Sequence, residues 1–233
     1  MLPNFDILYE DAQIIVCRKP AGIAVQSARA GQPDMVSILK NYLYKSNAAK
    51  EHPVKKEPYL AVIHRLDQPV EGVLVFAKTP FAAKELNKEM QSGGFGKHYH
   101  ARVKGRPPKD SDTIENYMVK DGRTNTSCIC SKDTKGAKLA RLTYTVIPSD
   151  NTESDATLLD ILLDTGRHHQ IRVQMANLGC PLIGDQKYGN VVQTDAASST
   201  SFQPRKPRTK LELCAYKLEF HHPKTKQLME FLF

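Results

Sequence analysis

The sequence has no long hydrophobic run, and its amino terminus lacks the pattern of a secretion signal. The longest apolar runs, such as residues 73–77, are far too short to cross a bilayer. Near the amino terminus stand Asp6, Glu10 and Asp11 instead of a basic segment followed by an apolar one. We therefore expect a cytoplasmic protein that does not use a membrane as a partner.

Cysteine is also scarce, with five residues in a chain of 233. An odd number in a chain long enough to build its own core argues against a disulfide scaffold and fits a reducing compartment. Cys128 and Cys130 are separated by one residue, and no second pair follows. We interpret them as strand residues, and we expect no metal site.

Acidic residues are outnumbered by basic ones, 25 against 33, which gives a formal charge of +8. This excess indicates an anionic partner, and nucleic acid is the first candidate. The alternative is a basic protein without such a partner. Apolar residues make up 40% of the chain, an ordinary proportion for a globular domain.

The pattern of apolar residues predicts about ten strands and three helices, which favours the α+β class. Asp34, Thr79 and the segment 165–167 each precede a helical pattern. Residues 193–210 are polar and rich in Ser, Thr and Pro, which predicts a mobile loop. We find no repeat and no clear linker, so we expect one domain over residues 1–233.

Three segments carry groups that can do chemistry. The first, residues 64–69, joins two apolar strands and carries Asp67, whose carboxylate a rigid sheet could present to a cleft. The ordinary alternative is an Asx-turn before Pro69. The second, residues 97–101, reads as a strand on which Tyr99 could stack on a base or could be a common strand aromatic.

The third segment, residues 165–172, places cations and amide donors at the predicted start of a helix. Such a start attracts anions. Arg172 follows the apolar Ile171 and could therefore reach a partly buried carboxylate. A solvated basic helix face is the alternative. Metal binding by His168 and His169 is disfavoured, because neighbouring residues diverge on a helix.

Taken together and in this order, these segments resemble those of the RluA-type RNA pseudouridine synthases. The segments that carry the resemblance are residues 7–11, 19–22, 64–67, 72–79, 97–101, 165–172 and 181–189, so that it covers nearly the whole chain. The boxes His-Arg-Leu-Asp and Thr-Gly-Arg-x-His-Gln-Ile-Arg are strongly diagnostic. The chain departs from the usual pattern at 70–72, at Gln174 and at Cys214.

The resemblance implies a pseudouridine synthase fold, with a central, mostly antiparallel mixed sheet flanked by helices. It implies an isomerase that breaks the N1–C1′ bond of a uridine in RNA and joins C5 to C1′. No atoms are lost and no redox change occurs, so we expect no cofactor. Asp67 resembles the catalytic carboxylate, which could add to the sugar, add to the base or assist removal of a C2′ proton.

The same resemblance assigns the other site residues. Tyr99 would stack on the uracil and move a proton, and Arg172 would keep the carboxylate ionised. Arg65 would help to extrude the target base, because guanidinium planes stack on bases. His64 would be structural or would face a phosphate. The further substrate-binding candidates are Arg167, His168, Gln170, Leu182 and Ile183, of which the last two could wall the uracil pocket or simply pack in the core.

Unstacked loop bases of rRNA or tRNA are the expected targets, which places the protein in rRNA or tRNA processing. We expect no S4 RNA-binding domain and no obligatory protein partner. A different class remains open, namely a catalytically silent RNA-binding protein with the same fold. Retention of Asp67, Tyr99 and Arg172 argues against it. A hydrolase that uses Asp67 and His168 would need a paired base or a metal, for which the sequence shows no pattern.

Overall fold

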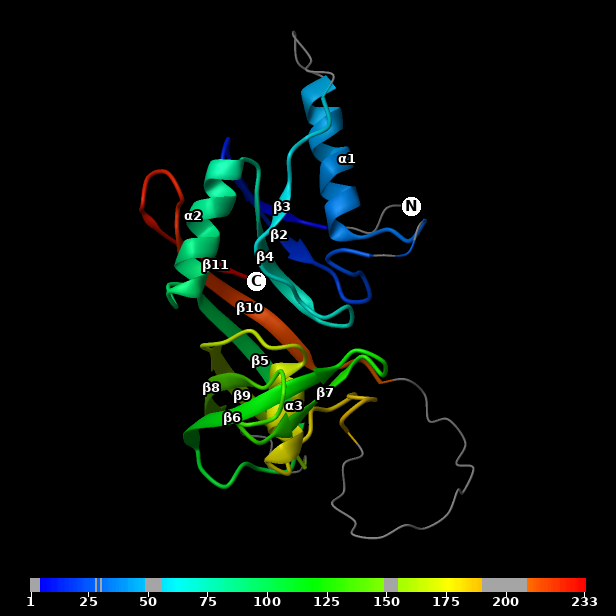
Figure 1. Ribbon diagram of the computed structural model, residues 1–233, viewed down its shortest axis with the longest axis vertical. Coiled ribbons are helices and arrows are strands. Elements are labelled where there is room, and N and C mark those ends of the chain that lie inside the picture. The colour runs from blue at the N-terminus through cyan, green and yellow to red at the C-terminus, as the bar shows by residue number, and fades with distance from the viewer. Residues whose placement is uncertain (1–4, 28, 30, 49–55, 149–154, 190–208) are drawn as a thin grey trace. The chain divides into compact units, whose positions relative to one another are not determined.

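The computed structural model describes residues 5–27, 29, 31–48, 56–148, 155–189 and 209–233 (Figure 1). The chain divides into two compact units, residues 1–99 with 214–233, and residues 100–213. Within the described residues, no helix combines the length and the apolar character that crossing a membrane requires. The predicted loop 193–210 falls outside the described residues except for 209 and 210.

The first unit is built on strands in the order β1-β2-β4-β10, with β3 paired to β4 and β11 paired to β10. All these pairs are antiparallel except β4 with β10, which run parallel. The elements are β1 (Ile7–Glu10), β2 (Ile14–Lys19), α1 (Met35–Ala48), β3 (Ala61–Val62), β4 (Glu71–Ala77), α2 (Pro80–Gln91), β10 (Leu213–His221) and β11 (Leu228–Leu232).

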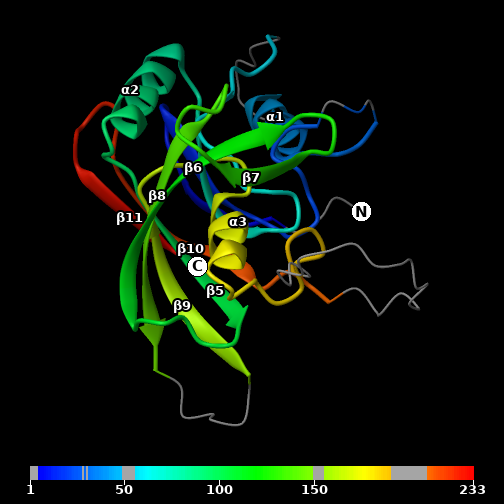
Figure 2. The same cartoon turned by 60° about the horizontal axis from the view of Figure 1, so that its bottom comes forward.

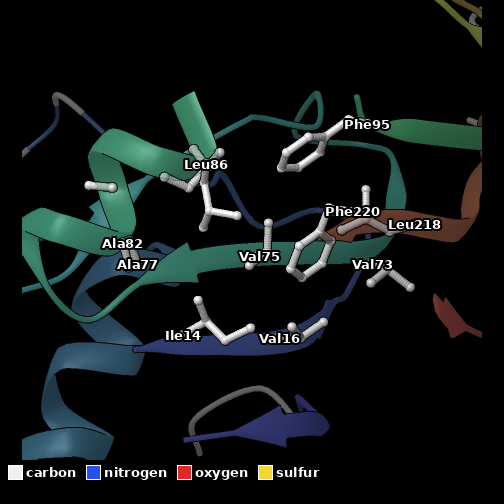
Figure 3. Close-up of a cluster of buried hydrophobic side chains, with 12 residues drawn as sticks. Ile14, Val16, Val73, Val75, Ala77, Ala82, Leu86, Phe95, Leu218 and Phe220 are labelled. Carbon is white, nitrogen blue, oxygen red and sulfur yellow. The ribbon is translucent and has the colours of Figure 1, made fainter. Parts of the chain in front are cut away.

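Both faces of β4 are buried, and the two helices flank these strands from opposite sides (Figure 1). Val73, Val75 and Ala77 point to one face, where they pack with Leu86 of α2 and with Phe220 of β10 (Figure 3). Their alternation with other buried residues follows from the two-residue period of a strand. A strand buried on both faces is a rigid support for the loop that precedes it.

The helix starts follow the predicted caps. The side chain of Asp34 accepts a hydrogen bond from the backbone N–H of Ser37 at 2.7 Å, and Thr79 Oγ1 accepts one from Ala82 at 3.1 Å. The pattern of apolar residues predicts Phe81, Leu86 and Met90 on the buried face of α2, and for Phe81 this prediction is wrong, because Phe81 is exposed. The alanines beside it, Ala82 and Ala83, face the core instead.

One glycine permits the close approach of β4 and β10 where their parallel pairing begins. Gly72 has φ 141°, and a Cβ there would lie 2.3 Å from the backbone oxygen of Ala215. Only glycine avoids this clash, because it has no Cβ. The approach places the chain of β10 directly beside the end of the loop that carries Asp67.

The second unit is antiparallel, with strands in the order β9-β8-β6-β7. Its elements are β6 (Ser111–Asp121), β7 (Thr126–Cys130), β8 (Lys138–Ile147), β9 (Ala156–Leu163) and α3 (Gln170–Asn177). Strand β5 (Gly96–Lys104) begins in the first unit and ends in the second. Eleven strands and three helices over the described residues, with a mixed and mostly antiparallel sheet, confirm the predicted α+β class.

Helix α3 lies beside β7 and shares an apolar cluster with the sheet (Figure 2). Val173 and Ala176 of α3 pack in this cluster against Met118 and Ala140. The predicted start of this helix was too early, because α3 begins at Gln170. His169 precedes it with a left-handed backbone, φ 55°. Arg167 and His168 therefore lie in the approach to the helix and not in its first turn.

Candidate active site

The loop that carries Asp67 connects β3 to β4 in the first unit. Its turn is closed by the backbone, since Val70 N–H donates to the main-chain oxygen of Asp67 at 3.0 Å. The alternative of an Asx-turn concerned the side chain of Asp67, and it stays a prediction. The side chain of Asp67 is half-buried.

A buried lysine ties this loop to the turn after β2. Lys19 has no exposed surface, and its ammonium donates to the main-chain oxygens of Pro20 at 3.0 Å, Ile23 at 2.7 Å and Gln68 at 3.1 Å. Gly22 N–H also donates to the oxygen of Gln68 at 2.8 Å. The residue next to Asp67 is therefore held by two donors from one turn.

The charge of Asp67 acts on two buried groups of the first unit. Burial lowers the pKa of Lys19 to about 8, although the charges of Asp67 and Glu71 oppose that change. Lys19 therefore still carries its proton at neutral pH. Burial, together with the charge of Asp67, raises the pKa of Tyr99, so its hydroxyl stays neutral. Asp67, Tyr99 and Lys19 form one electrostatically coupled group.

His64 is a neutral member of the same unit. Burial and the charge of Lys97 lower the pKa of His64 to about 3. Its ring lies edge-on to Phe95, with centroids 6.1 Å apart, and its Nε2 is 3.4 Å from the backbone nitrogen of Val75. A neutral imidazole among these groups favours the structural role over attraction to a phosphate. Arg65 is exposed to solvent.

Arg172, on α3 in the second unit, forms a buried ion pair. Its Nε and Nη2 donate to the two carboxylate oxygens of Asp185 at 2.7 and 2.8 Å. The exposed fractions of the two side chains are 6% and 0%. Burial alone would raise the pKa of Asp185, but Arg172 and the backbone N–H groups of Lys187 and Tyr188 hold that pKa below its usual range.

Tyr188 links this pair to two histidines. Its ring lies 5.2 Å from the guanidinium carbon of Arg172. Its hydroxyl oxygen accepts a hydrogen bond from Ser127 N–H at 2.9 Å and forms another with Nδ1 of His169 at 2.7 Å. His168 stacks on His169 at 3.7 Å, and its Nδ1 lies 2.9 Å from Ser127 Oγ.

The remaining candidates of the second unit make contacts within the protein. Arg167 Nε donates to the main-chain oxygen of Leu139 at 2.8 Å. Gln170 is buried, and its amide binds Thr165 Oγ1 and the backbone around it. Leu182 is buried and forms a bridge with Val103, while Ile183 is half-buried. Their roles toward a substrate stay predictions.

Sequence reasoning did not single out Lys19, Asp185 or Tyr188 for a function. Each stands in a segment that carries the family resemblance, but the residue type alone does not say that a lysine or an aspartate is buried. A signal was present for Lys19, because it ends a strand whose preceding residues are nearly all apolar. Asp185 and Tyr188 are spaced as the members of a turn, and in the structure the backbone N–H of Tyr188 donates to Oδ1 of Asp185.

Solved structures with this fold are RNA pseudouridylate synthase domains. Human RNA pseudouridylate synthase domain containing 4 superposes with a TM-score of 0.73 at 24% identity, over 97% of this chain and 87% of that one. The human domain containing 1 gives a TM-score of 0.71 at 21% identity, over 100% and 86%. At these identities the likeness concerns the fold.

The sequence identifies the family. Residues 13–177 match the family model of RNA pseudouridylate synthases. The ribosomal large subunit pseudouridine synthase D of Nitrosomonas europaea is 33% identical over 226 residues, which is 96% of this chain and 60% of the relative. The dual-specificity RNA pseudouridine synthase RluA of Vibrio parahaemolyticus is 31% identical over 227 residues, 96% of this chain and 80% of the relative. The chain belongs to the RNA pseudouridylate synthase family and is of the RluA type.

The chain is shorter than several of these relatives. It matches 58% of the length of an uncharacterized RNA pseudouridine synthase, YhcT of Bacillus subtilis, at 32% identity over 186 residues. The match to a ribosomal large subunit pseudouridine synthase C of Rickettsia prowazekii covers 56% of that protein.

Proposed function

We propose that this chain is an RNA pseudouridine synthase that isomerises specific uridines of rRNA or tRNA, with Asp67 as the catalytic carboxylate. The observation that carries the proposal is the coupled group in the first unit, where the charge of Asp67 acts on the buried Tyr99 and Lys19. A carboxylate held beside a buried aromatic ring suits a reaction at a flipped nucleoside. Both units would serve one catalytic domain over residues 1–233.

The reaction asks three things of the protein. The target uridine must leave its stack, a step for which the exposed Arg65 offers a guanidinium plane. The N1–C1′ bond must then break while Asp67 attacks or stabilises the cation-like sugar. Finally C5 bonds to C1′, and the proton on C5 is lost to solvent as N1 gains one.

Tyr99 enters this scheme as a neutral phenol. Because its pKa is raised, the hydroxyl keeps its proton, and the ring can stack on the uracil without carrying charge. If it accepts the C5 proton, it must pass its own proton to another acceptor, and the nearby Asp67 can serve as one. The family resemblance assigns Arg172 to the same reaction, in which its guanidinium would supply a positive charge.

RNA is the proposed partner, and the cytoplasm is the proposed compartment. The +8 charge provides the cations that neutralise phosphates. None of the five cysteines, all of which lie among the described residues, forms a disulfide, and burial raises the pKa of the Cys17 thiol to about 12, which leaves that residue unreactive. No observation favours the silent RNA-binding alternative. The reaction keeps all atoms and electrons, so the scheme needs no cofactor.

The test uses in vitro transcribed large-subunit rRNA and tRNA labelled with tritium at C5 of uridine, because the label enters water when C5 bonds to C1′. The wild-type chain should release tritium, and Asp67→Asn should lower the rate by roughly 10⁴-fold or more while folding and RNA affinity are retained. Asparagine keeps the shape of the loop but loses the charge. Asp133→Asn removes a carboxylate from an exposed turn and should leave the rate unchanged.

Two results would overturn the proposal. One is an absence of tritium release by the folded wild-type chain on both classes of RNA. The other is an Asp67→Asn rate within about tenfold of the wild-type rate, since tenfold corresponds to the loss of one ordinary contact.

A further inference from the structure

The carboxylate of Asp185 is held by several hydrogen bonds, and it lies against the guanidinium of Arg172. Besides the two hydrogen bonds from Arg172, its Oδ1 accepts the backbone N–H groups of Lys187 at 2.9 Å and Tyr188 at 3.1 Å. Its side chain has no exposed surface. Four donors therefore fix this carboxylate before any substrate is present.

The geometry of the pair determines how Arg172 can act. Asp185 contacts the guanidinium along the edge formed by Nε and Nη2, so the plane of that group is set by two bonds and not by one. The edge that includes Nη1 faces away from Asp185. The ring of Tyr188, 5.2 Å from the guanidinium carbon, supports Arg172 on one side.

Tyr188 is itself fixed at both of its ends. Its backbone N–H is bound by Asp185, and its hydroxyl is bound by Ser127 of β7 and by His169 at the start of α3. The adjacent Gly184 has no room for a side chain, because a Cβ there would lie 2.0 Å from the oxygen of Lys210. The chain around Asp185 is thus fixed from strand, helix and loop.

We propose that Asp185 is a positioning residue for the isomerisation: it acts through Arg172 by fixing the plane and direction of its guanidinium. This inference rests on the proposed function. A mobile arginine side chain must lose its rotamer freedom when it meets the reacting carboxylate or a phosphate, and the pair with Asp185 removes that cost beforehand. A buried pair is expensive to desolvate, so stability alone gives little reason for one here.

The experiment measures single-turnover tritium release from the labelled RNA pool, with saturation by RNA followed separately. Asp185→Asn keeps an oxygen for the N–H groups of Lys187 and Tyr188 but loses the charge that holds Arg172. The rate at saturating RNA should fall by roughly 10²-fold. The RNA concentration that gives half of the maximal rate should change less than about threefold, since the contacts with the substrate remain. The acid limb of the activity profile should move to higher pH.

Two further variants separate positioning from loss of structure. Asp34→Asn removes another buried, hydrogen-bonded carboxylate, which lies in the first unit at the start of α1. Asp34 as a whole residue is 7% exposed, the same fraction as the whole residue Asp185. The rate of Asp34→Asn should stay within about threefold of the wild-type rate. In an Arg172→Met background, Asp185→Asn should cost little more, because a residue that acts through Arg172 has nothing left to position.

The outcomes are distinct. If folded Asp185→Asn keeps both the wild-type rate and the wild-type pH profile, Asp185 is only structural and the inference is overturned. Equal losses in Asp34→Asn and Asp185→Asn would overturn it as well. If Asp185→Asn does not fold at 25 °C, Asp185→Glu replaces it. Glu keeps the charge but must shift by one methylene, and a full rate in that variant would also overturn the inference. Wild-type turnover decides the proposed function independently of these variants.

Discussion

The two units hold their candidate catalytic groups by opposite arrangements of charge. In the first unit, a buried cation, Lys19, binds main-chain oxygens around the loop of Asp67. In the second unit, a buried anion, Asp185, binds the side chain of Arg172 itself. The first arrangement depends on one side chain and on backbone atoms, which every sequence provides. The second depends on several specific side chains.

The difference also shows in how each unit treats its ionisable groups. Burial shifts the pKa values of Lys19 and His64 toward the neutral forms in the first unit. In the second unit, the pair with Arg172 favours the charged form of Asp185, because it lowers the pKa of that carboxyl. Lys19 and His64 therefore favour their neutral forms more than free side chains do, whereas Asp185 favours its charged form.

The largest effect should come from breaking the buried pair. Arg172→Met leaves the carboxylate of Asp185 buried without its cation, which costs about 3–5 kcal/mol of unfolding free energy. Arg102→Met removes a pair with Glu212 in the same unit, whose side chains are 47% and 36% exposed, and should cost about 0–1 kcal/mol. Urea unfolding of both variants measures the contrast, and equal losses would contradict it.

A smaller loss is expected when the cation of the first unit is removed. Lys19→Met deletes three hydrogen bonds and should cost about 2–3 kcal/mol. Gln68→Ala keeps the main-chain oxygen that Lys19 binds and loses only an exposed hydrogen bond from its Nε2 to the oxygen of Gly22, so it should cost about 1 kcal/mol or less. A large loss in Gln68→Ala would show that side chains, and not the backbone, hold this loop.

Lys19 also predicts a pH dependence. Its pKa is 10.5 in the unfolded chain and about 8 when folded, so the unfolded chain binds more protons between these values. The contribution of Lys19 to stability therefore rises with pH across that window. Buried tyrosines lower the stability as the pH rises, and they do so equally in wild type and in Lys19→Met. The difference in urea midpoint between wild type and Lys19→Met isolates the lysine, and it should grow from pH 8 to pH 9.5.

The smallest effect concerns His64 and acid. Its pKa is 6.5 in the unfolded chain and about 3 when folded, so its contribution is complete above pH 6.5 and is lost as the pH falls toward 3. By pH 5, wild type should lose up to about 2 kcal/mol more than His64→Gln. His221→Gln, at an exposed histidine, should follow wild type. If the free energy of unfolding changes with pH in the same way for wild type and His64→Gln, His64 is not buried as a neutral group.

Much of the fold could be predicted from periodicity and caps. The apolar strand that follows residues 64–69 and the helix after Asp34 stand where the pattern of apolar residues predicts them. Helix α3 was predicted too early, because the segment 165–167 was expected to open it and it begins at Gln170. The side chain of Gln170 binds Thr165 and Arg167 ahead of the helix, and such a side-chain contact with a preceding loop has no periodic signature.

The candidate site also has residues that the sequence could indicate and partners that it could not. Asp67, Tyr99 and Arg172 could be named because their segments resemble those of a family, and the membership of the chain in that family is now established. Nothing in the local sequence says that the ammonium of Lys19 is fully buried, or that Asp185 takes the guanidinium of Arg172 by two bonds. Gln68, one partner of Lys19, lies 49 residues away from it along the chain, and Asp185 lies 13 residues away from Arg172.

The sequence by itself determined the family, the α+β class and the residue types available for catalysis, because short-range patterns and segment order carry that information. Only the tertiary structure decided which charges are buried and which partners they take. Burial and pairing depend on contacts between residues far apart in the chain, and these contacts set the pKa values of Lys19, His64 and Asp185. They make one aspartate a candidate catalytic group and another a support for an arginine.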